Sequence, residues 1–201
     1  STPESGDEPP SSNGRAASYI TAELANPLFA EALFDYLPDV VFFVKDHRGF
    51  YVSVNNTLLI RCGFRHKHQL LGLAPSEVFP AELATNYTRQ DLHVLQTGAE
   101  IHDRLELHLY PNRNSGWCLT HKIPLRNPAG AIIGLAGISR DLRLPDQQHP
   151  VYQRIARAIE YVQTHYGEPL RLEDLAAMTN LSVAQFERYI QRIFGLTPKQ
   201  L

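Results

Sequence analysis

The stretch that decides the fold is PLRNPAGAIIGLAGISRDL, residues 124–142. It holds Asn127-Pro128-Ala129-Gly130, with proline at the second turn position and glycine at the fourth, which predicts a type I turn between two strands. The apolar run that follows is interrupted by Gly134 and Gly137, as in a strand that is covered on both faces and approached closely by another backbone. The chain changes after this strand from alternating to helical spacing. We therefore expect the strand to link two parts of the protein and to transmit a signal between them.

Composition bounds the possible functions. The chain has 201 residues, of which 43% are hydrophobic and 20% charged, with a formal net charge of −2. These values are typical of a soluble globular protein with one large or two small domains. The charge balance excludes a non-specific nucleic-acid coat, but it is compatible with sequence-specific binding through a few placed arginines. No apolar run is long enough to span a membrane, and residues 1–17 have the Ser/Pro/Gly-rich composition of a disordered tail without a signal peptide.

The sequence contains few of the residue spacings that are typical of metal-binding or catalytic sites. The two cysteines, Cys62 and Cys118, lack metal-ligand spacing and indicate reduced thiols in the cytoplasm. None of the nine histidines has a carboxylate or thiolate at ligand spacing, which argues against a metal site. No nucleophile elbow or phosphate-binding loop occurs, so we do not expect an enzyme. The sequence identifies no cofactor.

The pattern up to residue 142 predicts an α+β domain. A helix is expected over Pro27 to Leu37, ended by proline, with Phe29, Leu33, Tyr36 and Leu37 on one face. Two strand-like runs around a turn ending in Gly49 predict a hairpin, and the longest helical pattern ends at Gly98. Three alternating stretches then complete a five-stranded antiparallel sheet with helices on one face and room for a cavity between them.

This first part resembles the PAS sensor domains. The segments that carry the resemblance are LPDVVFFVKDHRGFYVSVNNTLL, LLGLAPSEVFP, VLQTGAEI and GWCLTHKIPLRNPAGAIIGLAGISRDL. Their order and spacing over about a hundred positions are more specific than any one of them. The resemblance implies a PAS sensor domain with its N-terminal helix over residues 18–142, acting as a small-molecule, redox or dimerisation module.

Four aromatic residues are the expected lining of the cavity, namely Phe43, Phe79, Tyr87 and Trp117. Aromatic walls with few polar groups suit an apolar or aromatic ligand. The alternative is a scaffold in which side chains fill the cavity and the domain serves only for dimerisation. In either case we expect a homodimer, formed through the helix Pro27 to Leu37 and the outer sheet face, because that amphipathic helix needs a partner.

After a polar, proline-bounded linker over residues 143–150, the spacing is helical. Ser182 and Gln185 form a capping-box pattern at the start of the last helix. EPLRLEDLAAMTNLSVAQFERYIQRIFGLTPKQL resembles the first helix-turn-helix of AraC/XylS-family transcription regulators. The family pattern continues into a second helix-turn-helix, and this chain stops at Leu201. The resemblance therefore implies a partial DNA-binding domain over residues 151–201, which we expect to bind an operator weakly by itself.

The resemblance also places the DNA-contacting positions. Those facing the major groove fall at Ala184, Glu187, Arg188 and Gln191, whereas Ser182 and Arg192 fall close to phosphates. Arg188 is the strongest candidate for reading a base. Taken together, the two resemblances predict a transcription regulator in which a small-molecule effector or other signal acts on DNA binding.

Overall fold

The computed structural model describes residue 25 and residues 28–111, 113–142, 144, 149–165 and 169–195. The chain divides into two units, Ser1–Ala30 and Glu31–Leu201, and almost all described residues belong to the second. Asn26 and Pro27, the expected helix start, the tail 1–17 and most of the linker 143–150 lie outside the described residues. In the described part of the chain, no helix is long and apolar enough to cross a membrane.

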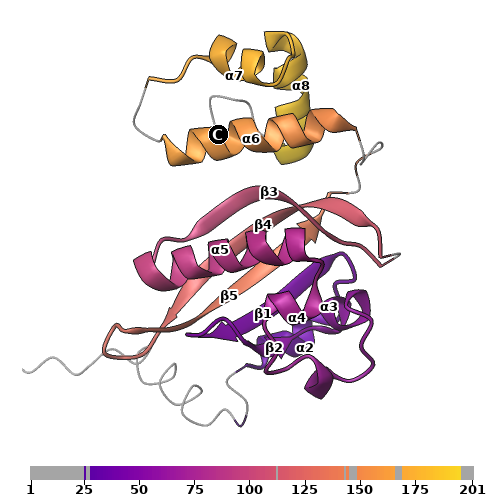
Figure 1. Ribbon diagram of the computed structural model, residues 1–201, viewed down its shortest axis with the longest axis vertical. Coiled ribbons are helices and arrows are strands. Elements are labelled where there is room, and N and C mark those ends of the chain that lie inside the picture. Colours follow the sequence, from indigo (N-terminus) through magenta and orange to yellow (C-terminus); the bar gives the residue numbers. More distant parts are fainter. Residues whose placement is uncertain are drawn as a thin grey trace, which may run out of the picture. The chain divides into compact units, whose positions relative to one another are not determined.

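A five-stranded antiparallel sheet forms the centre of the fold, as the sequence predicted (Figure 1). Its order is β2-β1-β5-β4-β3, so the first hairpin and the last three strands meet where β1 pairs with β5. The strands are β1 (Val40–Asp46), β2 (Tyr51–Val54), β3 (Ile101–Leu109), β4 (Ser115–Arg126) and β5 (Ile132–Asp141). The stretch that decided the fold is thus the turn into β5, the central strand.

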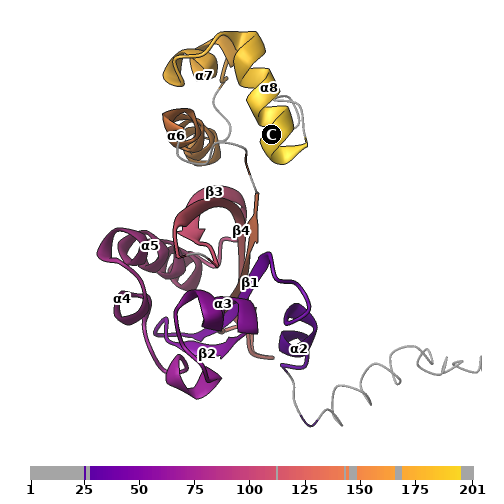
Figure 2. The ribbon, with the colours of Figure 1, turned by 90° about the vertical axis from the view of Figure 1, so that its right-hand side faces the viewer.

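Helices cover the inner face of this sheet. They are α3 (Asn56–Arg61), the 3₁₀ helix η1 (Lys67–Gln69), α4 (Pro75–Val78) and α5 (Ala81–Thr97). Asn55 caps α3 by accepting from the amide of Leu58, and Gly98 ends α5 in the left-handed conformation. Figure 2 shows α4 and α5 on one side of the sheet and α2 (Ala30–Phe34) on the other. α2 is shorter than the expected Pro27–Leu37, and Phe34 stacks on Phe42 of β1 at 4.5 Å between ring centroids.

Both predicted features of the β5 hairpin are confirmed. The amide of Gly130 donates to the carbonyl of Asn127 at 2.9 Å, which closes the turn. A Cβ at Gly134 would lie 2.3 Å from the carbonyl oxygen of Lys45, and one at Gly137 would lie 2.5 Å from the ring of Phe43. Because real Cβ atoms do not approach so closely, the two glycines let β1 and its side chains pack directly on β5.

The C-terminal part is helical, with α6 (Pro150–Thr164), α7 (Leu172–Met178) and α8 (Val183–Phe194). The predicted capping box of α8 is present, with Ser182 accepting from the amide of Gln185 and Gln185 accepting from that of Ser182. Arg154 of α6 donates to the carbonyl of Thr179 at 2.8 Å, which satisfies a backbone group at the end of α7.

These helices share a hydrophobic core with the outer face of β3 and β4. The cluster unites three strand residues with buried residues of the helices. Its strand members are Leu105, Trp117 and Leu119, and its largest helix members are Tyr152, Ile155, Ile159, Phe186, Ile190 and Ile193. The sequence predicted a small helical subdomain, and it did not indicate that the sheet supplies part of its core.

Candidate functional site

A carboxylate held between two lysines lies at the centre of the inner core. Lys45 projects inward from β1 and Lys122 from β4, and both side chains are almost fully buried. Lys45 Nζ donates to Asp91 Oδ2 at 2.5 Å, and Lys122 Nζ donates to Asp91 Oδ1 at 2.6 Å. Asp91 belongs to α5, so this Lys-Asp-Lys cluster joins the helix to strands from both ends of the domain.

Burial and mutual charge set the protonation of this cluster. Desolvation lowers the pKa of Lys45 to about 8, although the carboxylate of Asp91 opposes the shift. Burial alone would raise the pKa of Asp91, but the two ammonium groups outweigh it and hold that pKa below its usual value. Near neutral pH the ion pair between Lys45 and Asp91 is therefore charged on both sides.

A second polar group lines the same interior from β3. Glu106 is buried, with only 5% of its surface exposed, and it accepts hydrogen bonds from Gln90 at 2.6 Å and from Asn86 at 3.1 Å. His108 is also buried, and its Nδ1 lies 3.2 Å from the carbonyl oxygen of Leu109. Desolvation lowers the pKa of His108 to about 4, so its imidazole is neutral at physiological pH.

Aromatic rings surround these polar groups. Phe79 meets Tyr87 edge-on at 5.1 Å between centroids, and Tyr87 stacks on His108 at 5.4 Å. Lys45 Nζ lies 4.5 Å from the ring centroid of Tyr51, in cation–π geometry. The space left between these side chains measures about 10 Å³, which is room for about one water molecule.

Three of the four predicted cavity residues, Phe43, Phe79 and Tyr87, meet in this inner core. The fourth does not. Trp117 lies in the outer cluster, where its ring is 6.4 Å from that of Tyr152 on α6. Successive side chains of a strand alternate between faces, and it is Lys122, an odd number of positions away, that faces inward.

The comparisons with known proteins agree with this architecture. A family model described as the PAS fold matches residues 34–147, more than half of the chain. The chain belongs to the PAS fold family. No curated protein matches it.

Solved structures similar to this PAS protein extend the likeness in fold beyond the sensor domain. A structure of VqmA bound to DPO is 24% identical, with a TM-score of 0.50, over 86% of this chain and 82% of that one. A structure of the Vibrio cholerae VqmA dimer in the absence of target DNA is 22% identical, also with a TM-score of 0.50, over 86% and 83% of the two chains.

The charged residues of the PAS interior were missed by sequence reasoning. Glu106 and His108 alternate with leucines, and this alternation predicted a strand without assigning either residue to the interior. In the structure both side chains are buried, whereas Leu105 packs in the outer cluster with α6 and α8 and Leu109 packs in the inner core. The sequence of β1 did contain a usable signal. Lys45 follows Val41 and Phe43 at intervals of two residues, so its side chain lies on the same inward face of the strand. Among the described residues, no group of three or more His, Cys, Asp or Glu could hold a metal ion.

The predicted DNA-contacting residues share one exposed surface. The six residues are exposed at the start and along one side of α8, opposite the buried Phe186, Ile190 and Ile193. They are Ser182, Ala184, Glu187, Arg188, Gln191 and Arg192. The sequence pattern separated this face correctly from the buried stripe, and its contact with DNA stays a prediction.

Proposed function

We propose that this protein is a signal-responsive, DNA-binding transcription regulator whose PAS domain senses a small polar molecule. The observation that carries the proposal is the Lys-Asp-Lys cluster, Lys45, Asp91 and Lys122, buried among aromatic rings. Sequence reasoning favoured an apolar or aromatic ligand. The polar interior favours instead a flat molecule that combines ring surface with hydrogen-bonding groups.

The cost of the cluster supports a functional role. Removing charged groups from water costs several kcal/mol per ion, and replacing buried ion pairs by packed apolar residues is often neutral or stabilising. A domain that served only as a scaffold would fold as well with an apolar interior. Buried charges in a ligand-binding fold are therefore expected where recognition needs them.

The alternative function is a dimerisation scaffold without a ligand, and one observation favours it. The interior void of about 10 Å³ has no room for a molecule larger than water unless side chains move. In the sensing hypothesis, ligand entry displaces side chains such as Lys45, whose ammonium group already has a weakened proton affinity. VqmA, which resembles this chain in fold, is described as bound to DPO.

Native mass spectrometry of freshly purified protein, with an absorption spectrum, separates the two functions. A retained small-molecule mass that is lost on denaturation supports sensing. Two results together would favour the scaffold: no retained mass, and no shift in melting temperature across a library of small heterocycles. Lys122→Met is the matched variant, since it alters the interior without changing the DNA-binding surface.

For the C-terminal helices we propose a reader of the AraC type, with α8 entering the major groove. The support is the sequence resemblance of residues 168–201 together with a short α7, a tight turn and an α8 whose exposed side is polar. The test is selection of binding sites from random DNA, which should enrich a defined sequence.

We further propose that the protein acts in the cytoplasm as a homodimer through α2 and the outer sheet face. Leu33 and Tyr36, in and just after α2, expose 63% and 83% of their surface, and Ile123, on the outer face of β4, exposes 43%. Apolar residues gathered in this way favour a protein partner. A monomeric mass by light scattering at micromolar concentration would contradict the dimer.

A further inference from the structure

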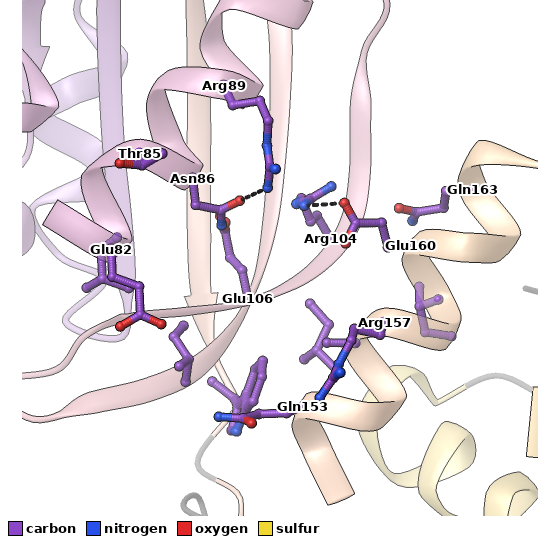
Figure 3. A pocket seen from close by; sticks show the side chains of 16 residues that line it. Glu82, Thr85, Asn86, Arg89, Arg104, Glu106, Gln153, Arg157, Glu160 and Gln163 are labelled. Carbon is purple, nitrogen blue, oxygen red and sulfur yellow. Dashed lines mark hydrogen bonds and ion pairs between the residues drawn. The ribbon is translucent and has the colours of Figure 1, made fainter. Parts of the chain in front are cut away.

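A groove of about 420 Å³ lies between α5, β3, β4 and α6, next to the PAS interior, with which it shares Glu106. Three arginines line it from three different elements: Arg89 of α5, Arg104 of β3 and Arg157 of α6 (Figure 3). Its remaining walls include the apolar Leu105 and Trp117. Its volume is within the range of small-molecule sites.

Arg104 has a donor that the protein leaves unused. Its Nη2 donates to Glu160 Oε1 at 3.1 Å, which joins β3 to α6. Its Nε is buried and has no hydrogen-bond partner among the described residues. Nε and Nη2 form one edge of the guanidinium group, the edge that binds both oxygens of a carboxylate. Glu160 therefore occupies half of a site built for a bidentate anion.

Three glutamates line the groove beside the three arginines, so the pairing of each charged group decides whether Arg104 can accept an anion. Neither Arg89 nor Arg157 forms an ion pair with a described residue. Glu106 is already occupied by hydrogen bonds from Asn86 and Gln90, and Glu82 lies well away from Arg104 (Figure 3). Glu160 is the carboxylate that an incoming anion must displace, and its half-exposed side chain is free to turn into solvent.

We propose that this groove binds a small organic carboxylate. The carboxylate would take the Nε–Nη2 edge of Arg104, and the apolar body would lie against the leucine and tryptophan side chains of the wall. Binding would release Glu160 and so weaken one link between the PAS sheet and the first helix of the DNA-binding part. The proposal concerns a second site and does not depend on a ligand in the PAS interior.

The chain carries its own reporter for a test. Trp117 is the single tryptophan and lines the groove. Titration of the full chain with benzoate, followed by tryptophan emission, should show saturable binding. Benzyl alcohol, which has the ring without the charge, and inorganic phosphate, which has charge without a ring, should bind much more weakly.

Two variants of opposite effect make the test specific. Arg104→Gln should weaken benzoate binding by about tenfold or more, because it removes charge-assisted hydrogen bonds. Glu160→Gln should tighten binding, since it removes the competing charge at an exposed position. Arg48→Gln, at the distant β1–β2 turn, is the control and should behave as the wild type.

Several outcomes would overturn the proposal. They are no saturable response to benzoate, equal responses to benzoate and benzyl alcohol or phosphate, and a response that Arg104→Gln leaves unchanged. Weaker binding in Glu160→Gln would also overturn it, even if Arg104→Gln proved too unstable to measure. Circular dichroism of each variant checks that it is folded.

Discussion

Arg61 of α3 and Asp141, the last residue of β5, form a buried bidentate ion pair, with Nη1–Oδ1 and Nη2–Oδ2 both at 2.8 Å. The same guanidinium group donates to the carbonyls of Leu109 and Pro38. One side chain therefore ties the start of β1, the end of β3 and the end of β5 to a helix whose leucines line the PAS core. This is the point at which the sheet leads into the helical part of the chain.

The first prediction concerns this ion pair. Asp141→Asn removes the charge that compensates a fully buried arginine, and breaking one partner of such a pair typically costs about 3 to 5 kcal/mol. Chemical denaturation should therefore show that the free energy of unfolding falls by an amount of that order. The double variant Arg61→Met/Asp141→Leu leaves no unpaired charge and should recover most of it. Equal stability of Asp141→Asn and the wild type would show that the pair is not uniquely required.

The backbone architecture was predictable because its signals are local. Glycine and proline at fixed turn positions, strand alternation and helix caps depend on a few neighbouring residues, and they placed all five strands and the helices α5 and α8. Gly134 and Gly137 even indicated a close backbone approach that the structure confirms. The short α2 is an exception. It ends at Phe34, and a turn follows it before Pro38, the residue that was expected to end the helix.

The interior was less predictable because burial of a face depends on what packs against it. Alternation in β3 separates Leu105 from Glu106, but it does not say which face meets the inner helices. The outer face of β3 and β4 is covered by residues more than thirty positions later in the chain, Tyr152 and Phe186 among them. For the same reason Trp117 was expected in the cavity and lies instead in the outer core.

The second prediction is a loss of stability in acid that depends on His108. The unfolded histidine binds a proton at its ordinary pKa of 6.5, whereas the buried one resists protonation until about pH 4. Between these values the unfolded state holds more protons, so stability falls as the pH falls, by roughly 3 kcal/mol over the window. His108→Phe should flatten this slope in denaturation measurements at pH 7 and pH 4.5, whereas exposed His93→Gln should not. An unchanged slope in His108→Phe would assign the acid sensitivity to another group.

The third prediction separates the stability of the Lys-Asp-Lys cluster from its function. Asp91→Asn leaves two buried ammonium groups without their carboxylate partner and should destabilise the domain by about 3 to 5 kcal/mol. The triple variant Lys45→Met/Asp91→Leu/Lys122→Met should be as stable as the wild type or more so. If the cluster serves recognition, this stable variant should retain no ligand in native mass spectrometry. A triple variant as unstable as Asp91→Asn would instead make the cluster structural.

The last prediction concerns base reading by Arg188. It is exposed on α8, on the side opposite the buried stripe, where the recognition helix of a helix-turn-helix contacts bases. If the arginine pairs bidentately with a guanine, Arg188→Ala should cost roughly 1 to 3 kcal/mol and relax preference at one base pair. The measurement is a titration of wild type and variant on selected and singly mismatched sites at two salt concentrations.

Arg192, one turn further along α8, provides the comparison. A residue that contacts only phosphate lowers affinity evenly across sequences and reduces the salt slope by about one. Arg192→Ala should behave in this way, and Arg188→Ala should not. If both variants lose affinity evenly, Arg188 positions the helix without reading a base. If Arg188→Ala changes neither affinity nor specificity, the arginine is a solvated residue of α8, and base reading belongs to other residues on this face, such as Glu187 or Gln191.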